Sequence, residues 1–508
     1  MKIKIKMPTK TTLINFLKEY YPLLIIVLIA TIIRIYHLNI RGDFWFDEWF
    51  SMHFATLPTL KESWYYWVLE TNPPLHTFLL RCYLFFVNTT NETLIRLPSL
   101  ILGISSIILL YFTAKKIFNK NTAIWSAILL SFSGLFIDLN TENRVYSLLM
   151  FLSIASLYLF YTLAFERKNK KIFWILYFIT NLLLVYSHLT AIVILLLQMI
   201  SLTLARADKK LVKKFFIFNF FVGIIWLFWF LPHMINILNL NTASAWYFTT
   251  SENFIKSILF SIIGAFTLIN YPQVTPVIIL LILLASIFFI KEIYKANNAE
   301  RNKLVFLNFY FLFPIASSAM LGVMVTKYYS AFYPALFILF ARLIDLYAKN
   351  FKRKFAVYTI LPLIFLPLSY WAIVTPYFSW TEFTNHIKDS KTERSIIIIP
   401  HHETKVFKKY YDGDLPIAKL YLRDDNYSFE ERVVKYNFVM ETTTKTKLTK
   451  WLDDYTKNKN QVFLLAYENN YKWVDKILLE KGWELIYNKN GTGRTPYNLK
   501  EFIKNEID

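Results

Sequence analysis

Long apolar stretches alternate with short polar connections through the chain up to about residue 375. A helix needs roughly 18 to 20 mostly apolar residues to cross a bilayer. One such stretch lies near the N-terminus, and the others lie at about residues 94–117, 121–138, 144–166, 172–187, 188–206, 213–236, 274–294, 303–326, 328–347 and 354–375. The pattern predicts a mainly α-helical, polytopic membrane protein with about 11 transmembrane helices.

The first apolar stretch follows a basic segment, MKIKIKMPTK, as the apolar part of a secretory signal would. It is longer than that part of a signal peptide, and no small-residue cleavage site follows it. We therefore interpret it as an uncleaved signal anchor with a cytoplasmic N-terminus.

Two shorter apolar stretches, Leu75–Val87 and Phe254–Asn270, would raise the number of spans to 13 if both crossed the membrane. Basic residues discriminate between the alternatives, because cytoplasmic connections carry an excess of Lys and Arg. With 11 spans the inner segments hold 25 Lys and Arg and the outer segments seven, whereas a single extra span at Leu75–Val87 would move several basic clusters outside. We expect both short stretches to lie flat at the outer interface or to be re-entrant.

The pattern changes after Pro376 to short strand-like runs separated by amphipathic helical stretches from Lys445 and Tyr471. The strand-like runs are SIIIIP from Ser395, RVVKYNFVM from Arg432, QVFLLAY from Gln461 and WELIYNK from Trp483. Residues 1–375 are therefore predicted to form the transmembrane domain, and residues 376–508 a small soluble α/β domain. Eleven spans place the soluble domain on the extracytoplasmic side.

The composition supports a membrane protein and removes two other classes. Of the 508 residues, 56% are hydrophobic and only 18% are charged, which excludes a disordered chain. The net charge is +21, but residues from Pro376 onward hold 22 basic against 20 acidic side chains, so the excess lies in the short connections between apolar stretches. We therefore expect no nucleic-acid partner. The single cysteine, Cys82, excludes an intramolecular disulfide and a zinc site built on paired thiolates.

Two adjacent acids, Asp47 and Glu48, follow the first span within RGDFWFDEWFSMHFA. The surrounding aromatic residues are typical of the headgroup level of a membrane. The plainer interpretation is a solvated acidic loop with interfacial aromatics, and the functional one is a pair of catalytic carboxylates. Composition alone favours the plainer one.

Other polar residues lie in further outer connections, and each has an ordinary structural interpretation on its own. His76 lies in NPPLH, Glu142, Arg144 and Tyr146 lie in DLNTENRVYS, His188 lies between two closely spaced spans, and Lys327 begins KYYSAFYPAL. Arg144, for example, could simply pair with Glu142. Together they share one side of the membrane with Asp47 in the 11-span topology. Mixed charge at a lipid boundary suits a reaction on a lipid-linked anion.

Six segments also match, in order, the motifs of one protein family. They are Asp47-Glu48 after the first span, NPPLH, RLPSLILG, TENRVYSLL, YSHLTAIVILL and KYYSAFYPALFIL, between about residues 20 and 347. With these segments the sequence resembles the GT-C superfamily of polytopic glycosyltransferases, most of all the branch of protein O-mannosyltransferases and lipid A aminoarabinose transferases. Members move a sugar from a polyprenyl phosphate carrier to an extracytoplasmic acceptor, so the resemblance implies that fold and donor class here.

The resemblance also implies roles for the candidate residues. Asp47 matches the catalytic acid and would be the general base of an inverting single displacement, and Glu48 would orient the acceptor or a helper side chain. Cations are needed for the phosphate. The implied phosphate-binding residues are Arg144, Lys327, His76 and Tyr146, with Glu142 and His188 in supporting roles.

The sequence departs from the family pattern at two of these positions. Many relatives have Arg where this chain has Lys327, which weakens the assignment of that residue. The aminoarabinose transferases carry Lys where this chain has Asn72, which puts aminoarabinose as the sugar in doubt. The sequence identifies the activity only as a hexosyl- or pentosyltransferase.

We expect no obligatory cofactor, because a donor with a single phosphate needs no nucleotide-type metal clamp and one carboxylate base suffices. A divalent metal held by Glu48, Glu142 and His188 is the alternative. The expected partners are a polyprenyl-phosphate-linked sugar donor, a lipid, glycan or protein acceptor, and membrane lipids. The expected location is the plasma membrane, with a mannosyltransferase-like role in the cell envelope.

Two other functions stay open at this level. A polytopic transporter or lipid flippase with an outer gating or sensing domain would show similar hydropathy, although such proteins usually carry internal repeats and broken helices, which the sequence does not clearly show. An inactive relative that serves as a membrane scaffold for cell-envelope assembly would match the same motifs.

Overall fold

The structure is a computed structural model and describes residues 10–204, 207–239, 262–265, 290–320, 325–348, 379–400, 403–420, 445–467, 472–490 and 497–504, with residues 370, 373 and 374. The chain divides into two compact units. The described parts of Met1–His37, Arg96–Trp226 and Thr250–Ile373 form the first unit, and those of Leu38–Ile95, Leu227–Thr249 and Val374–Asp508 form the second. We describe each unit by itself.

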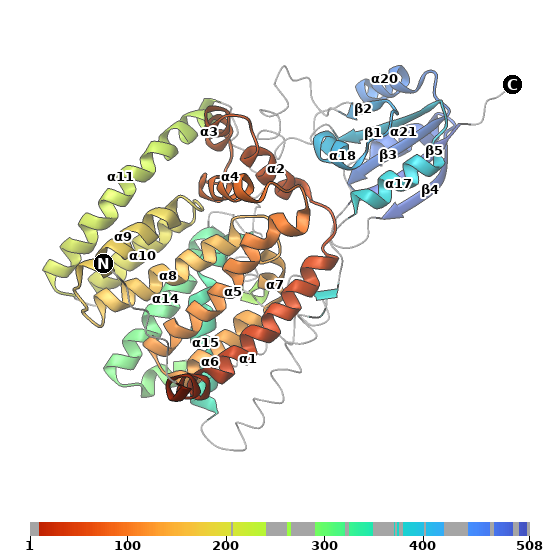
Figure 1. Cartoon of the computed structure of the whole chain (residues 1–508). Coiled ribbons are helices and arrows are strands. Elements are labelled where there is room, and N and C mark those ends of the chain that lie inside the picture. The colour runs from red at the N-terminus through yellow and green to blue at the C-terminus, as the bar shows by residue number, and fades with distance from the viewer. Residues whose placement is uncertain are drawn as a thin grey trace. The chain divides into compact units, whose positions relative to one another are not determined.

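Helices make up the described part of the first unit (Figure 1). They are α1 (Lys10–Ile40), α5 (Glu92–Ile117), α6 (Lys120–Ser131), α7 (Gly134–Leu139), α8 (Tyr146–Ala164), α9 (Lys171–Val185), α10 (Ala191–Leu204), α11 (Lys209–Asn239), α14 (Asn298–Met320), the 3-10 helix η1 (Thr326–Ala331) and α15 (Tyr333–Tyr347). The last residues of α1 from Leu38, the first of α5 up to Ile95 and the part of α11 from Leu227 belong to the second unit. Within the described residues, four helical segments are long and apolar enough to cross a membrane: Leu17–Ile40, Glu92–Ile117, Tyr146–Ala164 and Lys209–Asn236. The chain is therefore a multi-pass membrane protein.

The number of spans stays a prediction. The expected spans at residues 274–294 and 354–375, and the short stretch Phe254–Asn270, lie largely outside the described residues. Among the described helices, Lys171–Val185 and Ala191–Thr203 are apolar but shorter than a full span.

One expected span, at residues 121–138, is not a single helix. It forms α6 and α7, with a break at Phe132 and Ser133. The Ser133 hydroxyl accepts a hydrogen bond from the Phe136 N–H (3.3 Å) and thereby caps α7. The same hydroxyl donates to the Ala265 carbonyl (2.5 Å). The hydropathy pattern misses this break because the residues on both sides of it are apolar.

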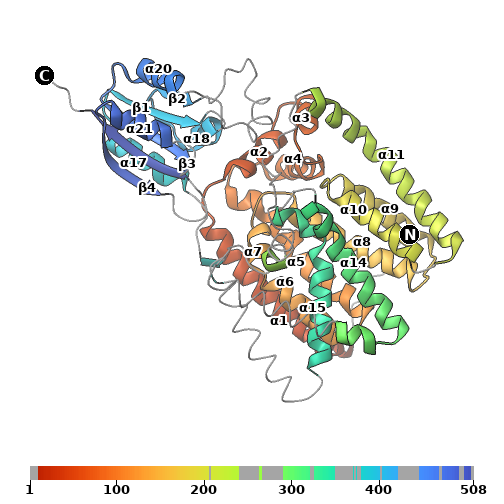
Figure 2. The same cartoon turned by 180° about the vertical axis from the view of Figure 1, so that it is seen from behind.

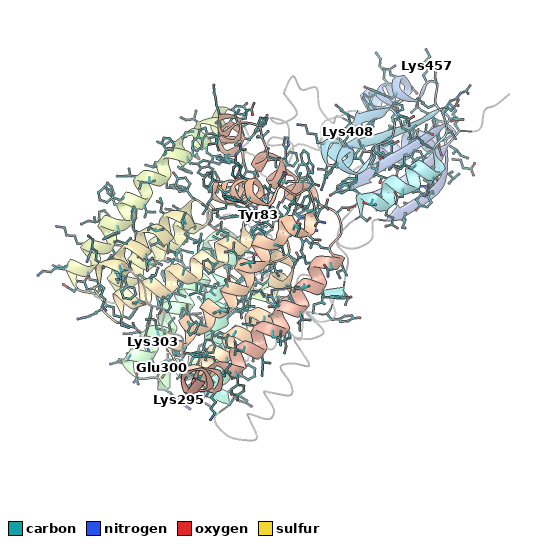
Figure 3. The ribbon with its side chains drawn as sticks, viewed as in Figure 1. Tyr83, Lys295, Glu300, Lys303, Lys408 and Lys457 are labelled. Atoms are coloured by element: carbon teal, nitrogen blue, oxygen red, sulfur yellow. The ribbon has the colours of Figure 1, made fainter. Side chains whose placement is uncertain are left out.

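Five of the segments that the charge pattern assigns to the inner side contact one another in the first unit, namely those around residues 19, 115–120, 166–171, 206–214 and 291–303. Figure 3 shows Lys295, Glu300 and Lys303 at the N-terminal end of α14. Four contacts join five of these segments: Lys115 Nζ with Glu19 Oε1 (2.6 Å), Lys116 Nζ with Glu166 Oε2 (2.7 Å), Lys214 Nζ with Asn169 Oδ1 (2.8 Å), and Lys303 Nζ with the Ile117 carbonyl (2.8 Å).

The second unit combines a mixed sheet and its helices with three short helices (Figure 2). These three helices lie in the first connection, the segment 41–91 between α1 and α5. The sheet has the strand order β2-β1-β3-β5-β4, in which β1 runs parallel to β2 and β3, and β5 runs antiparallel to β3 and β4. The elements are α2 (Phe46–Ala55), α3 (Leu60–Leu69), α4 (Leu75–Val87), α17 (Trp380–Ser390), β1 (Ser395–Pro400), α18 (Thr404–Tyr410), β2 (Ile417–Leu420), α20 (Lys445–Thr456), β3 (Gln461–Tyr467), α21 (Lys472–Glu480), β4 (Glu484–Asn490) and β5 (Tyr497–Ile503).

Three of the expected strands, those beginning near Ser395, Gln461 and Trp483, are confirmed as β1, β3 and β4. The two expected helices from Lys445 and Tyr471 are confirmed as α20 and α21. The run from Arg432 lies outside the described residues. Strands β2 and β5 were not predicted.

Alternate residues of the strands point to opposite faces of the sheet, and each face has its own core. One core joins Ile396, Ile398, Val462, Leu464 and Phe502 with residues of α20 and α21. The other joins Ile397, Ile399, Phe463, Leu465 and Leu499 with α17, α18 and the first connection, through Phe44, Trp49, Phe50, Phe54, Trp67, Leu80 and Leu84. The first connection and the C-terminal sheet therefore share one hydrophobic core.

The short stretch Leu75–Val87 forms helix α4, which has 13 residues. At 1.5 Å per residue it is about 20 Å long, too short for a hydrocarbon core of about 30 Å. On one side Arg81 Nη1 donates to the carbonyls of Ala55 (3.2 Å) and Leu57 (2.6 Å), while Phe85 and Phe86 are about four-fifths exposed on the other (81% and 82%). An interfacial position for α4 stays a prediction that this amphipathic character supports.

Candidate active site

Three connections meet in the first unit: the loop between α7 and α8, the loop between α9 and α10, and η1. The Lys327 Nζ lies 5.4 Å from the centre of the Tyr146 ring. The His188 ring centre lies 6.1 Å from that of Tyr146 and 5.2 Å from that of Tyr328. Thr190 Oγ1 donates to the Tyr328 carbonyl (3.3 Å) and joins the second and third connections.

The charge of Arg144 and Lys327 converges on His188, which is buried (5% exposed). Burial first, and then these two cations, lower the pKa of His188 to about 3. The ring is therefore neutral at physiological pH. Its Nδ1 lies 3.2 Å from the Thr190 backbone nitrogen and 2.9 Å from Thr190 Oγ1, so Thr190 holds the ring in place.

The loop between α7 and α8 is held from behind by α1 and α5. Asn140 accepts a hydrogen bond from Arg34 Nε (3.0 Å) and donates to Ser147 Oγ (3.0 Å). Gly103 of α5 leaves the room for Asn140, since a Cβ at Gly103 would lie 2.2 Å from Asn140 Cγ. His37 Nδ1 contacts Thr141 Oγ1 (2.7 Å) on the same loop. These contacts set the path of the loop that carries Glu142 and Arg144.

The sequence interpretation missed Arg34 and His37. The available signal was their position inside an apolar span, where ionisable residues are rare and usually have a purpose. Both side chains are fully buried (0% exposed). Asn140 and Thr141 accept or share their hydrogen bonds, so the purpose seen here is to order the loop.

Glu142 and Tyr146 are buried and Arg144 is half-buried. The Arg144 N–H donates to the Glu142 carbonyl (2.8 Å), which gives the loop a tight turn. Together with His188 and Lys327, these residues are the part of the predicted set that the first unit contains.

Asp47, Glu48 and His76 belong to the second unit. Asp47 and Glu48 occupy the first turn of α2, where the helix dipole favours negative charge. Asp47 is half-buried. Glu48 is fully buried, and its Oε1 lies 3.9 Å from Nε of Arg41, which is equally buried. His76 is half-buried in the first turn of α4.

The sequence interpretation missed Arg41 as the partner of Glu48. Six residues lie between the two in the chain, and one of them, Gly42, has a left-handed backbone (φ 78°), which glycine adopts without strain. The turn brings the guanidinium back toward α2. Glu48 is thus committed to an ion pair, whereas Asp47 is the more accessible of the two acids.

The alternative of a bound divalent metal has no support in the described part of the chain. No group of three or more His, Cys, Asp and Glu residues there is arranged to hold an ion. The expectation of no obligatory metal stays a prediction.

The fold defines a polytopic membrane protein whose connections between helices carry charged residues. Its C-terminal sheet packs in one core with the first connection. A family model described as dolichyl-phosphate-mannose-protein mannosyltransferase matches residues 71–236. No curated protein sequence gives a significant match.

Solved structures extend the likeness to nearly the whole chain. ArnT from Cupriavidus metallidurans in the apo state has a TM-score of 0.54 at 13% identity, over 94% of this chain and 97% of that chain. ArnT from the same organism bound to undecaprenyl phosphate has a TM-score of 0.57 at 11% identity, over 95% of this chain and 98% of that chain. Part of the chain thus matches the mannosyltransferase family model, and nearly all of it shares the fold of ArnT. Both findings agree with the resemblance that the sequence motifs indicate.

Proposed function

We propose that this protein is a membrane glycosyltransferase that moves a sugar from a polyprenyl-phosphate donor to an extracytoplasmic acceptor. The observation that carries the proposal is the convergence of Arg144 and Lys327 on His188 and Tyr146, from three connections of the first unit. The likeness in fold to a structure bound to undecaprenyl phosphate supports the same donor class.

The two cations suit a phosphate monoanion or dianion. An Arg guanidinium grips phosphate oxygens through paired N–H groups, and a Lys ammonium acts as a point charge. His188 is neutral and adds no third charge to the site. The Tyr146 ring shields the Lys327 ammonium on one side. Such a site would stabilise the charge that develops on the leaving polyprenyl phosphate.

Asp47 is the proposed general base. It would accept the proton of the acceptor hydroxyl while that oxygen attacks the anomeric carbon and the carbon–phosphate oxygen bond breaks, which inverts the configuration. Glu48 would act through its ion pair with Arg41, which fixes the first turn of α2. His76 and Glu142 keep supporting roles in this proposal.

The orientation proposed for the chain is a cytoplasmic N-terminus and an extracytoplasmic C-terminal domain in the plasma membrane. The joined basic segments of the first unit support it, because such clusters favour the cytoplasmic side. The acceptor would be a lipid, glycan or protein.

Two substitutions test the function. Purified protein is assayed for transfer from polyprenyl-phosphate sugars with Asp47→Asn and Arg144→Ala, against matched controls Asp412→Asn (side chain 84% exposed) and Lys168→Ala (54% exposed). Asp47→Asn is expected to lower kcat by about 100-fold or more, because general base catalysis typically contributes 100- to 10,000-fold. Arg144→Ala is expected to weaken donor binding. Unchanged turnover in both variants would remove the mechanism, and absent wild-type transfer with every donor tried would remove the function.

A further inference from the structure

The backbone of Phe44 is held by two helices of the C-terminal part of the chain. Its N–H donates to the Tyr410 hydroxyl of α18 (2.8 Å). Its carbonyl accepts a hydrogen bond from the Trp380 indole Nε1 of α17 (3.2 Å), across 336 residues of sequence. Both backbone polar groups of Phe44 are thus bound by side chains from another region of the second unit.

The neighbouring groups are held by the same two helices. The Asp43 carboxylate accepts hydrogen bonds from the Thr381 N–H (2.7 Å) and hydroxyl (2.9 Å) in the first turn of α17, where helix N–H groups lack partners within the helix. The Lys409 ammonium of α18 lies 4.3 Å from the centre of the Phe44 ring.

A half-buried acid, Glu92, adds to the contacts of α18. Lys409 forms an ion pair with Glu92, and the Tyr410 hydroxyl donates to the same carboxylate (3.0 Å). Burial, with Glu92 next, raises the pKa of Tyr410 far above its usual value, so the hydroxyl stays protonated and able to donate. Phe44, Trp380 and Phe407 also pack in one hydrophobic core.

Phe44 directly precedes α2, whose first turn carries Asp47. The N-cap residue Trp45 has extended backbone and no side-chain hydrogen bond to the helix. The start of α2 therefore takes its position from Asp43 and Phe44 rather than from its own cap.

We propose that α17 and α18 position the catalytic loop, residues 42–50. Trp380 and Tyr410 bind the backbone of Phe44 and thereby fix the position of Asp47. This inference rests on the proposed function and assigns the C-terminal domain a part in catalysis. Trp380 and Tyr410 are positioning residues, because they touch the loop and not the reacting atoms.

The test uses the full chain with Trp380→Phe and Tyr410→Phe, which remove the hydrogen bonds and keep an aromatic ring. Trp483→Phe, a buried Trp on the opposite face of the sheet, and Tyr411→Phe, the buried neighbour of Tyr410, are the matched controls. Hydrogen–deuterium exchange measures how well the amides of residues 42–50 are protected. Transfer kinetics per folded molecule measure the effect on catalysis by Asp47.

We expect faster exchange at residues 42–50 in both variants and in neither control. We expect kcat to fall by about 10- to 100-fold, the size of effect that a small misplacement of a catalytic group produces, with the KM for the donor unchanged. Thr381→Ser should behave like the wild type, and the isosteric Thr381→Val should share part of the kcat loss.

Unchanged exchange in Trp380→Phe and Tyr410→Phe would overturn the inference whatever the activity. Faster exchange with wild-type kcat would overturn the role of Trp380 and Tyr410 in catalysis. A merely structural role would lower the yield of folded protein and leave kcat per folded molecule intact, which also overturns it. If the wild-type chain transfers no lipid-linked sugar, the proposed function fails, and the exchange data alone still decide whether the two helices hold the loop.

Discussion

The Lys327 ammonium lies 5.4 Å from the centre of the Tyr146 ring, although Lys327 is the second residue of η1 and Tyr146 begins α8, much earlier in the chain. Tyr146 lies in turn beside His188, and His188 beside Tyr328. This chain of contacts gathers residues from three separate connections, which the proposed phosphate site requires.

Lys327 should matter through its charge. Lys327→Met keeps the length and apolar stem of the side chain but removes the ammonium, and we expect kcat/KM for the lipid-linked donor to fall about 100- to 1000-fold, as for loss of one preorganised donor. Lys327→Arg should retain most of the activity, because a guanidinium keeps the positive charge and can bind phosphate oxygens. Steady-state kinetics with purified protein measure both, and equal activity of the Met and Arg variants would contradict a phosphate role.

His188 should make folding stability depend on pH. Its pKa is lowered from 6.5 to about 3 in the folded chain, so the folded state binds fewer protons than the unfolded state between these values. The stability that neutral His188 contributes is present above pH 6.5 and is lost as the pH falls toward 3. We expect His188→Gln to flatten the pH dependence of the unfolding temperature in this window, measured in detergent by intrinsic fluorescence. Identical pH profiles for the variant and the wild type would show that His188 does not titrate in this way.

Gly103→Ala should displace the loop that carries Arg144. The new Cβ would lie 2.2 Å from Asn140 Cγ, and forcing extra volume into a packed site typically costs about 1–3 kcal/mol. Gly223 in α11 is the matched control, because a Cβ there meets no atom within 4 Å. Gly223→Ala should instead stabilise the chain by about 0.5–1 kcal/mol, since glycine is unfavourable inside a helix. Gly103→Ala should therefore lower the unfolding temperature and weaken donor binding. Gly223→Ala should raise the unfolding temperature and leave donor binding unchanged.

Substitution of only one member of the Arg41 and Glu48 ion pair should strongly lower the free energy of unfolding. Both side chains are fully buried at 3.9 Å, and removing one partner of such a pair typically costs about 3–5 kcal/mol. We expect Glu48→Gln and Arg41→Gln each to lower the unfolding temperature strongly, and the double variant to lose much less than the sum. A double-mutant cycle measures this coupling, with the exposed Glu393→Gln as control. Strict additivity would mean that the two charges do not depend on each other.

Several elements were predictable because their signal is local. The spans at Glu92–Ile117 and Tyr146–Ala164 are apolar runs long enough to cross a membrane, and the strands at Ser395 and Gln461 are short continuous apolar runs. Strand β5 was missed because Lys500 and Glu501 interrupt its apolar pattern, and Glu501 is buried only because His386 and Gln461 bind its carboxylate (2.8 Å and 2.6 Å). The break between α6 and α7 was missed because it depends on a hydrogen bond from Ser133 to a residue far along the chain.

By itself the sequence determined that this is a multi-pass membrane protein with a C-terminal α/β region, and it named Arg144, Tyr146, His188 and Lys327 as candidates, since hydropathy, charge bias and short motifs are written along the chain. Only the tertiary structure decided that those four residues meet, that Arg34 and Gly103 shape their loop, and that Trp380 and Tyr410 bind the backbone of Phe44. These relations join residues far apart in the chain, so they follow from how helices and strands pack and from which buried polar groups need partners.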